Sequence, residues 1–262
     1  MKIENRNWVD IISKEFSHPA TALWRSIEVR YLEEAIKKYN PVLPVLDLGC
    51  AEGKIGSILF KERCLFGLDN CWDLIRQNQK TDTYKALILA DACQMPFGDG
   101  SFSCIFSNSV IEHIPDLQAL MTEVARVLKK GGLFIFTVPS NKFGQFLFFH
   151  VLFKKLGLNS LAGWYSKKRN SRLNHFHCYG HNVWQEKLNG KGFRLLEYVY
   201  YMPKKAVMLW DFLATAFFMV DKIQPFSLLE KKITLKLRSI FEKYLNQDCG
   251  LGGGLLIIAV KN

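Results

Sequence analysis

The chain has 262 residues, enough for one domain with insertions or for slightly more than one domain. Hydrophobic residues make up 49% and aromatic residues 13% of it, so the composition excludes a disordered or fibrous protein. The formal net charge is +11, and the excess comes from one region, because residues 124–185 contain no acid. That region suggests an anionic partner. Its basic residues are Arg126, Lys129, Lys130, Lys142, Lys154, Lys155, Lys167, Lys168, Arg169 and Arg172.

Cysteine usage and hydropathy predict the cellular compartment. The 7 cysteines are scattered and include no CxxC pair, which indicates reduced thiols rather than a disulfide framework. The first eight residues contain no apolar segment typical of a signal peptide. No stretch reaches the roughly 18 uncharged apolar residues of a membrane-spanning helix, since the nearest, 206–220, contains Asp211. We therefore expect a cytoplasmic protein and leave open a peripheral contact with a membrane.

Apolar runs alternate with helical patterns in the first half of the chain. A helix is predicted over 21–39, where apolar residues recur at helical spacing. Five apolar runs and three intervening helices follow: runs at 42–48, 64–68, 86–90, 103–106 and 132–138, and helices at 54–61, 73–79 and 116–128. Such alternation is typical of parallel strands joined by crossovers, and continuous apolar runs indicate strands covered on both faces. The sequence therefore predicts a doubly wound α/β sheet.

The pattern changes after Pro139. Residues 143–153 are apolar and aromatic, and a basic stretch without an assigned element follows over 154–180. Beyond it the sequence predicts a helix over 181–190, a strand over 193–201, two helical segments over 204–244 and a last strand over 254–260.

A turn rich in small residues, Asp47-Leu48-Gly49-Cys50-Ala51-Glu52-Gly53, follows the first predicted strand. Small residues at 49, 51 and 53 let the backbone pass close to a ligand at the carboxyl ends of the strands. The dinucleotide spacing G-x-G-x-x-G fails here, because position 51 is Ala and position 54 is Lys. A phosphate-binding P-loop also fails, because no Gly-Lys-Ser/Thr follows.

Two further acids end the second and third predicted strands. At the position of Asp69 a carboxylate can accept hydrogen bonds from the two hydroxyls of a ribose. At the position of Asp91 a carboxylate can accept a hydrogen bond from an adenine amine. Either acid alone could simply cap the next helix. Three aspartates at successive strand ends, beside the glycine turn, favour one ligand site.

These motifs together resemble class I S-adenosylmethionine-dependent methyltransferases of the small-molecule, ubiquinone-biosynthesis-like type, also called methyltransferase type 11. The resemblance is strong over residues 42–140 and weak over the last two strands. It gives almost no information about the acceptor. One departure is Ala51, where the family often has Gly. The matching segments are Val45–Gly53, Phe66–Asp69, Asp91–Phe102, Ser107–Ile114 and Arg126–Gly132.

The resemblance implies a seven-stranded, mostly parallel, Rossmann-like fold, with helical insertions after strand 5 and between strands 6 and 7. Residues 254–260 would supply a seventh strand, antiparallel at the sheet edge. The expected organisation is an N-terminal helical lid over 1–41, an S-adenosylmethionine-binding core over 42–140, a basic aromatic insertion on the acceptor side over 141–180, and the C-terminal part of the core over 181–262, with a helical insertion over 204–247.

The resemblance also assigns cofactor residues. Gly49, Ala51 and Gly53 would pass along the methionine part, and Asp47 would orient its amino group. Asp69 with Asn70 would hold the ribose, and Asp91 with Ala92 would hold the adenine. Asn108 would lie beneath the sulfonium.

Methyl transfer from an activated cofactor needs alignment above all, and it needs a base only if the acceptor is a hydroxyl or an acidic carbon. His113, which follows the fourth strand, and His175 and His177 in the basic stretch are the candidate bases. His113 could instead pack under the cofactor. No metal is predicted, because the histidines of residues 175–181 lack a second ligand cluster.

The acceptor is predicted only by class. Aromatic faces beside Lys and Arg, over 143–153 and 204–244, suit a small-molecule or lipid-linked acceptor and peripheral contact with an anionic membrane. These segments could also simply pack as a core. RNA is the less favoured partner, because the Asn/Asp-Pro-Pro-Tyr/Phe signature of base-amine methylation is absent. A non-catalytic S-adenosylmethionine-binding protein stays open.

Overall fold

The computed structural model describes residues 7–60, 65–78, 82–221, 227–245 and 247–262. The chain divides into two compact units. A helical unit comprises Met1–Tyr31, Lys142–Leu173 and Tyr200–Gly254, and a sheet unit comprises Leu32–Asn141, Asn174–Val199 and Leu255–Asn262. The predicted lid role of residues 1–41 and the other predicted segment boundaries stay predictions.

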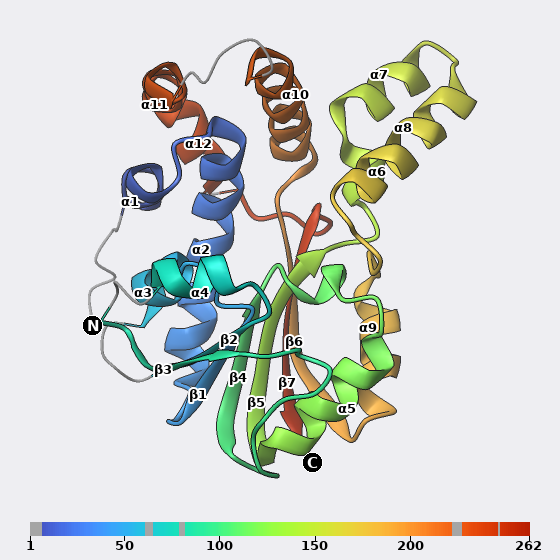
Figure 1. Cartoon of the computed structure of the whole chain (residues 1–262). Coiled ribbons are helices and arrows are strands. Elements are labelled where there is room, and N and C mark those ends of the chain that lie inside the picture. Colours follow the sequence, from blue (N-terminus) through green and yellow to red (C-terminus); the bar gives the residue numbers. More distant parts are fainter. Residues whose placement is uncertain (1–6, 61–64, 79–81, 222–226, 246) are drawn as a thin grey trace. The chain divides into compact units, whose positions relative to one another are not determined.

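The described residues contain a 7-stranded sheet in the order β3-β2-β1-β4-β5-β7-β6 (Figure 1). β1 pairs in parallel with β2 and β4, β2 with β3, and β4 with β5. The predicted doubly wound, mostly parallel α/β sheet is thus confirmed. Its strands are β1 Val45–Leu48, β2 Leu65–Asp69, β3 Tyr84–Leu89, β4 Phe102–Asn108, β5 Leu128–Pro139, β6 Phe193–Tyr201 and β7 Gly254–Lys261.

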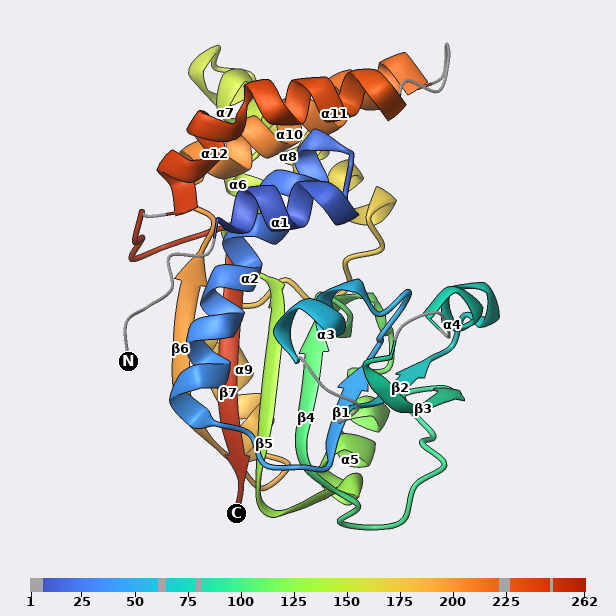
Figure 2. The same ribbon diagram turned by 90° about the vertical axis from the view of Figure 1, so that its left-hand side faces the viewer.

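Helices cover both faces of this sheet. α3 (Lys54–Leu59) and α4 (Trp72–Asn78) lie on one face, and α5 (Leu117–Val127) and α9 (His181–Asn189) lie on the other (Figures 1 and 2). All four residues of β1 are buried, as expected for a strand covered on both sides. Parts of the elements predicted over 54–61, 64–68, 73–79 and 204–244 lie outside the described residues, namely Lys61, Cys64, Gln79 and 222–226.

The position expected for the last strand is wrong. β7 lies between β5 and β6 rather than at the edge of the sheet. The burial of the two strands explains the order: residues 254–259 of β7 are all buried, whereas β6 includes exposed positions such as Arg194 and Tyr198. A fully buried strand needs backbone partners on both sides, whereas an edge strand can leave one side to solvent.

The helical unit contains α1 (Trp8–Glu15) and the first part of α2 (Pro19–Tyr39). This unit also contains α8 (Asn159–Arg172), a helix that the sequence did not predict. Its buried residues are Ala162 and Arg169, so the helix has no apolar stripe. The two helical segments expected over 204–244 are three helices in the described residues. The remaining elements are α6 Phe143–Phe146, α7 Phe148–Lys155, α10 Lys204–Asp221, α11 Ser227–Lys236 and α12 Arg238–Leu245.

A cluster of aromatic side chains packs within the helical unit. The Trp24 ring contacts those of Phe143, Trp210 and Tyr201, with centroids 5.5–6.1 Å apart. The Tyr201 hydroxyl donates to the buried Glu28 carboxylate at 2.6 Å. Among the described residues, no helix has the length and apolar character needed to cross a membrane.

Candidate functional site

The glycine turn lies at the carboxyl end of β1, beside the end of β2. Because β1 and β2 are parallel and in register up to Leu48 and Leu68, their ends meet at one edge of the sheet. The backbone N–H groups of Gly49 and Cys50 both donate to the Leu68 carbonyl, at 2.7 and 3.1 Å. The turn is therefore fixed at its start by the neighbouring strand.

Three residues of the turn have left-handed backbone: Gly49 at φ +78°, Ala51 at φ 45° and Gly53 at φ +76°. A Cβ on Gly49 would come 2.4 Å from a methyl carbon of Val110, and one on Gly53 would come 2.1 Å from Oδ1 of Asn78. Both the conformation and the space therefore require glycine at 49 and 53. Ala51 adopts its left-handed conformation against the preference of an L-residue.

Asp69, the last residue of β2, fastens the turn. Its Oδ2 accepts from the backbone N–H of Ala51 at 2.9 Å, and its Oδ1 accepts from that of Cys71 at 2.9 Å. A carboxylate oxygen has room for more than one hydrogen bond, so these contacts leave acceptor capacity for a ligand. Asn70, which follows it, is exposed.

Asp47 lies inside β1 rather than after it and is buried. Its Oδ2 accepts a hydrogen bond of 2.6 Å from the Tyr84 hydroxyl. Burial raises the pKa of Asp47 to about 7, against the lowering effect of this bond.

Sequence reasoning did not find Tyr84 or Asn78. Tyr84 begins β3, and Asn78 ends α4, where its Nδ2 donates to the Ala51 carbonyl at 3.2 Å. Neither residue belongs to a spaced motif around the turn, and only the packing of β3 and α4 brings them to it.

The remaining predicted cofactor positions lie after β3 and at the end of β4, the strands that pair with β2 and β1. Asp91 is exposed, two residues beyond β3, and its Oδ1 accepts from the backbone N–H of Cys93 at 2.8 Å; Ala92 between them is half-buried. Asn108 ends β4, is buried, and donates from Nδ2 to Oγ1 of Thr137 on β5 at 2.7 Å. The parallel pairing of β1 with β4 places Asn108 at the same edge as the turn.

His113 ends a short 3-10 helix, Ile111–His113, after β4. Its Nδ1 lies 3.2 Å from the Asn174 carbonyl, and its Nε2 lies 3.7 Å from Oε1 of the buried Glu112. The His113 and His175 rings are 5.3 Å apart. Hydrogen bonding from Nδ1–H to a carbonyl leaves the Nε2 lone pair to accept a proton, as a general base requires.

His177 is placed differently. It is buried, its Nε2 lies 2.8 Å from the Ile114 carbonyl, and its Nδ1 lies 3.3 Å from the Tyr179 hydroxyl. One residue earlier, the Phe176 N–H donates to the Glu112 carbonyl at 2.8 Å. His177 therefore helps hold the segment after Asn174 against the residues that follow β4.

Within the described residues, one group of three side chains could share a metal ion. The nearest ligand atoms of Glu112, His113 and His175 all lie within 4.8 Å of one another. The same geometry suits a base with a carboxylate near its Nε2 atom. The expectation of no metal stays a prediction.

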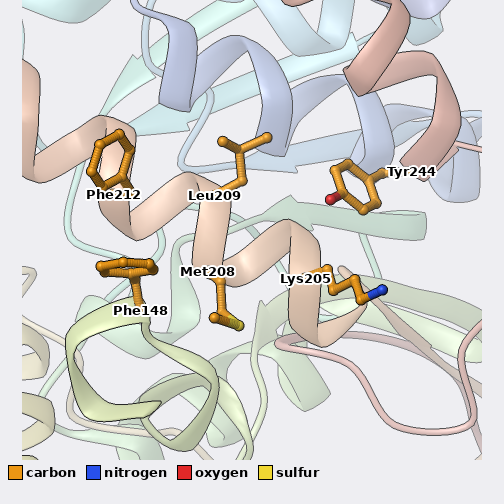
Figure 3. A pocket seen from close by; sticks show the side chains of 6 residues that line it. All are labelled: Phe148, Lys205, Met208, Leu209, Phe212 and Tyr244. Carbon is orange, nitrogen blue, oxygen red and sulfur yellow. The ribbon is translucent and has the colours of Figure 1, made fainter. Parts of the chain in front are cut away.

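The helical unit contains an apolar pocket of about 340 Å³ (Figure 3). Phe148 and Phe212 pack edge to face in its lining with centroids 5.5 Å apart, and Lys205 contributes to the lining as well. The lining residues come from α7, α10 and α12: Phe148, Lys205, Met208, Leu209, Phe212 and Tyr244. The pocket suits an apolar group.

Comparison with known proteins agrees with this geometry. Residues 46–136 match the family described as a methyltransferase domain. A protein of Encephalitozoon cuniculi that is named as a methyltransferase is 28% identical over 193 residues, covering 71% of this chain and 85% of its own.

The malonyl-[acyl-carrier protein] O-methyltransferase of Legionella pneumophila is 31% identical over 139 residues, which cover 48% of this chain and 49% of that enzyme. The likeness therefore spans about half of each protein. A phosphoethanolamine N-methyltransferase of Haemonchus contortus, solved with phosphomonomethylethanolamine and S-adenosylhomocysteine, has the same fold. Its TM-score is 0.55 at 17% identity, and the match covers 97% of this chain and 60% of that one. Residues 46–136 therefore form an S-adenosylmethionine-dependent methyltransferase domain of the small-molecule type.

Proposed function

We propose that the chain transfers a methyl group to a lipid-type acceptor, or to a small molecule with an apolar part, at a membrane surface. The observation that carries this proposal is the apolar pocket of the helical unit, in which Phe148, Met208 and Phe212 accompany one cation, Lys205. An acyl, prenyl or ring system would gain free energy by burial there, and a negative group would pair with the ammonium.

The residues at the sheet edge fit S-adenosylmethionine. Gly49 and Gly53 let the turn pack closely against the side chains of Val110 and Asn78, and the Asp69 carboxylate is fixed within hydrogen-bond distance of the turn. Gly49, Ala51 and Gly53 would lie along the methionine part, with Asp47 at its amino group. Asp69 with Asn70 would hold the ribose, Asp91 with Ala92 the adenine, and Asn108 would lie near the sulfonium.

The bound cofactor supplies an electrophilic methyl group, so the chain has to align an acceptor and, for some acceptors, remove a proton. His113 would take that proton at Nε2, and the Glu112 carboxylate 3.7 Å away would stabilise the imidazolium. His175 would stand beside His113 as a second candidate base, and His177 would position the segment that carries His175.

Known relatives act on chemically diverse acceptors, by their names a malonyl group on a carrier protein and a phosphorylated amine. An acidic or phosphorylated acceptor would suit a chain with a net charge of +11.

Tritiated S-adenosylmethionine separates the acceptor classes. The chain is incubated with a cell extract, and label is followed into the organic phase, the aqueous small molecules and the RNA. We expect label in the organic phase. Label confined to RNA, or to polar small molecules without an apolar part, would overturn the lipid-type proposal, and no transfer at all would favour a non-catalytic binding protein.

A matched pair of variants ties the transfer to the pocket. Met208→Glu places a charge among the lining residues, whereas Leu251→Glu changes a residue that is 53% exposed. We expect Met208→Glu to reduce transfer by about tenfold or more while S-adenosylmethionine affinity is kept. Equal transfer by both variants would contradict the role of the pocket.

A further inference from the structure

The hairpin of α7 and α8 exposes large apolar side chains around its turn, and the two helices run side by side (Figure 1). We call these residues the apolar tip. Their exposed fractions are 36% for Leu152, 63% for Leu156, 47% for Leu158, 38% for Leu161 and 59% for Trp164. Leucines scattered singly on a surface need no explanation, but an adjoining set with a tryptophan marks an interaction site.

The inner face of the same hairpin is well packed, so the exposure does not come from a loose element. Nδ1 of His150 on α7 lies 2.7 Å from the Ser166 hydroxyl on α8. Tyr165 donates to the buried Asp211 on α10 at 2.9 Å, and Arg169 pairs with the same carboxylate at 3.2 Å. Leu161 and Trp164 lie beside this network on α8, and both side chains stay exposed.

Lysines frame the apolar tip. Lys154 and Lys155 lie between Leu152 and Leu156, Lys167 and Lys168 follow Trp164, and all four lysines are exposed. The sequence has no acid between residues 124 and 185. In the part of the chain that the structure describes, no carboxylate forms an ion pair with these four lysines, since Asp211 pairs with Arg169. The hairpin surface is therefore apolar at its turn and positive around it.

A recess at the base of the hairpin extends the positive surface. It has a volume of about 630 Å³ and brings Lys154 and Lys155 of α7 together with Lys204 of α10 and His150. Gln145, Phe146 and Val151 complete its lining. Ammonium groups around a recess of this size suit the phosphate of a lipid headgroup.

We infer that the α7–α8 hairpin is the element that docks on an anionic phospholipid bilayer. The tip residues would enter the boundary between headgroups and acyl chains, where tryptophan is favoured, and the lysines would contact lipid phosphates while their alkyl stems stay in apolar surroundings. A protein partner fits less well, because lysine is depleted at protein–protein interfaces. The inference rests on the proposed function at a membrane surface and names the residues that make the contact.

Flotation of the full chain with vesicles tests it. The chain should float with vesicles of phosphatidylcholine and phosphatidylglycerol at low salt, and should stay at the bottom of the gradient with phosphatidylcholine alone. Leu161→Ala/Trp164→Ala should reduce the floating fraction by about tenfold. The matched control is Trp72→Ala, which removes a tryptophan that is 52% exposed on α4 of the sheet unit. Equal flotation of the two variants would overturn the inference.

A double charge-reversal variant tests the lysines around the apolar tip. Lys154→Glu/Lys155→Glu should abolish the dependence of binding on phosphatidylglycerol, whereas Lys130→Glu, an exposed lysine of β5, should keep it. Quenching by brominated lipid gives a direct readout: Trp164→Phe should lose most of the quenching, and Trp72→Phe should keep it. Quenching that survives Trp164→Phe would place the contact elsewhere and overturn the inference.

Failure of this inference is distinguishable from failure of the proposed function. Flotation and quenching require no acceptor, and S-adenosylmethionine binding by calorimetry checks that each variant is folded. A chain that methylates a lipid extract but does not float would overturn the hairpin inference alone. A chain that floats through the hairpin but labels only polar molecules would overturn the lipid-type acceptor alone. A dimer that Trp164→Ala dissociates would assign the tip to a second copy and overturn membrane docking.

Discussion

Tyr84 donates a 2.6 Å hydrogen bond to Asp47, and both side chains are buried, with 8% and 3% of their surface exposed. The bond joins the start of β3 to β1, the strand that leads into the glycine turn. Burial also raises the pKa of the Tyr84 hydroxyl, so it keeps its proton and acts as a donor. β1, the strand that leads into the glycine turn, therefore contains an acid, Asp47, whose charge depends on pH.

We expect Asp47 to contribute a loss of stability as the pH rises from about 4 to about 7. The pKa of Asp47 is raised in the folded state from its ordinary 3.8 to about 7, so over this range the folded chain binds the proton and the unfolded chain does not. The stabilisation from the protonated acid is complete below the unfolded pKa and is lost as the pH passes through the folded one. The melting temperature of Asp47→Asn should show a flatter pH dependence.

Two variants control this measurement. Asp73→Asn, which changes an exposed acid on α4, should keep the wild-type slope. Tyr84→Phe removes the donor to the Asp47 carboxylate, so it should move the loss of stability to higher pH. An unchanged slope in Asp47→Asn would show that other groups cause the pH dependence.

Ala51→Gly should not weaken the chain. Ala51 has a φ of 45°, and a left-handed alanine costs roughly 1–2 kcal/mol, which exceeds the entropic cost of a new glycine. We expect an unfolding free energy equal to the wild type or up to about 1 kcal/mol higher. Ala125→Gly, inside α5, should instead lower it by about 1 kcal/mol. Equal losses in the two variants would contradict strain at residue 51.

Gly53→Ala should reduce S-adenosylmethionine affinity by at least about tenfold, measured by calorimetry. The new Cβ would meet Oδ1 of Asn78 at 2.1 Å, so the turn or the asparagine must move. Gly192→Ala is the matched control, because Gly192 has a φ of +78° with nothing within 4 Å of the added carbon. It should lose stability through the backbone alone and keep the affinity. Intact binding in Gly53→Ala would argue against contact between the turn and the cofactor.

For an acceptor that loses a proton, His113→Gln should lower the transfer rate by about 10²-fold or more, without changing cofactor affinity. Loss of the acidic limb of the pH–rate profile would identify a base rather than a positioning residue. His177→Gln removes the hydrogen bond to Ile114 and should cost about 1 kcal/mol of stability with a smaller effect on rate. A greater loss of rate in His177→Gln would exchange the two assignments.

Chelation should leave methyl transfer unchanged, because Glu112, His113 and His175 would act in proton transfer without a metal ion. The test compares rates after dialysis against a chelator and after adding Zn²⁺, Mn²⁺ or Mg²⁺. Activity that disappears with the chelator and returns with one ion would make the same three side chains its ligands, whose nearest atoms lie within 4.8 Å of one another.

The sequence was sufficient for what local patterns determine. Continuous apolar runs marked the strands, and Asp116 marked the start of α5, where its side chain accepts from the Ala119 N–H at 2.9 Å. The small residues at 49 and 53 indicated a tight turn, and both prove to be left-handed. Each of these features depends on neighbours in sequence.

The features that escaped depend on distant segments. Tyr84 and Asn78 reach the turn only because β3 and α4 pack beside β1 and β2, and neither carries a periodic signal of its own. α8 has too few apolar residues to give a helical pattern in the sequence. It is held instead by polar contacts, from Tyr165 and Arg169 to Asp211 on α10. The position of β7 in the sheet likewise depends on its pairing with β5 and β6, which are distant from it in sequence.

The position of β7 between β5 and β6 has a consequence for synthesis on the ribosome. β6 is made before β7 but reaches the rest of the sheet only through it, so the facing edges of β5 and β6 wait without their partner until residues 254–261 have been made. Unpaired strand edges are templates for wrong pairing. The nascent chain should therefore be most prone to aggregation in this interval, and ribosome-bound chains arrested just before residue 254 should bind chaperones most strongly.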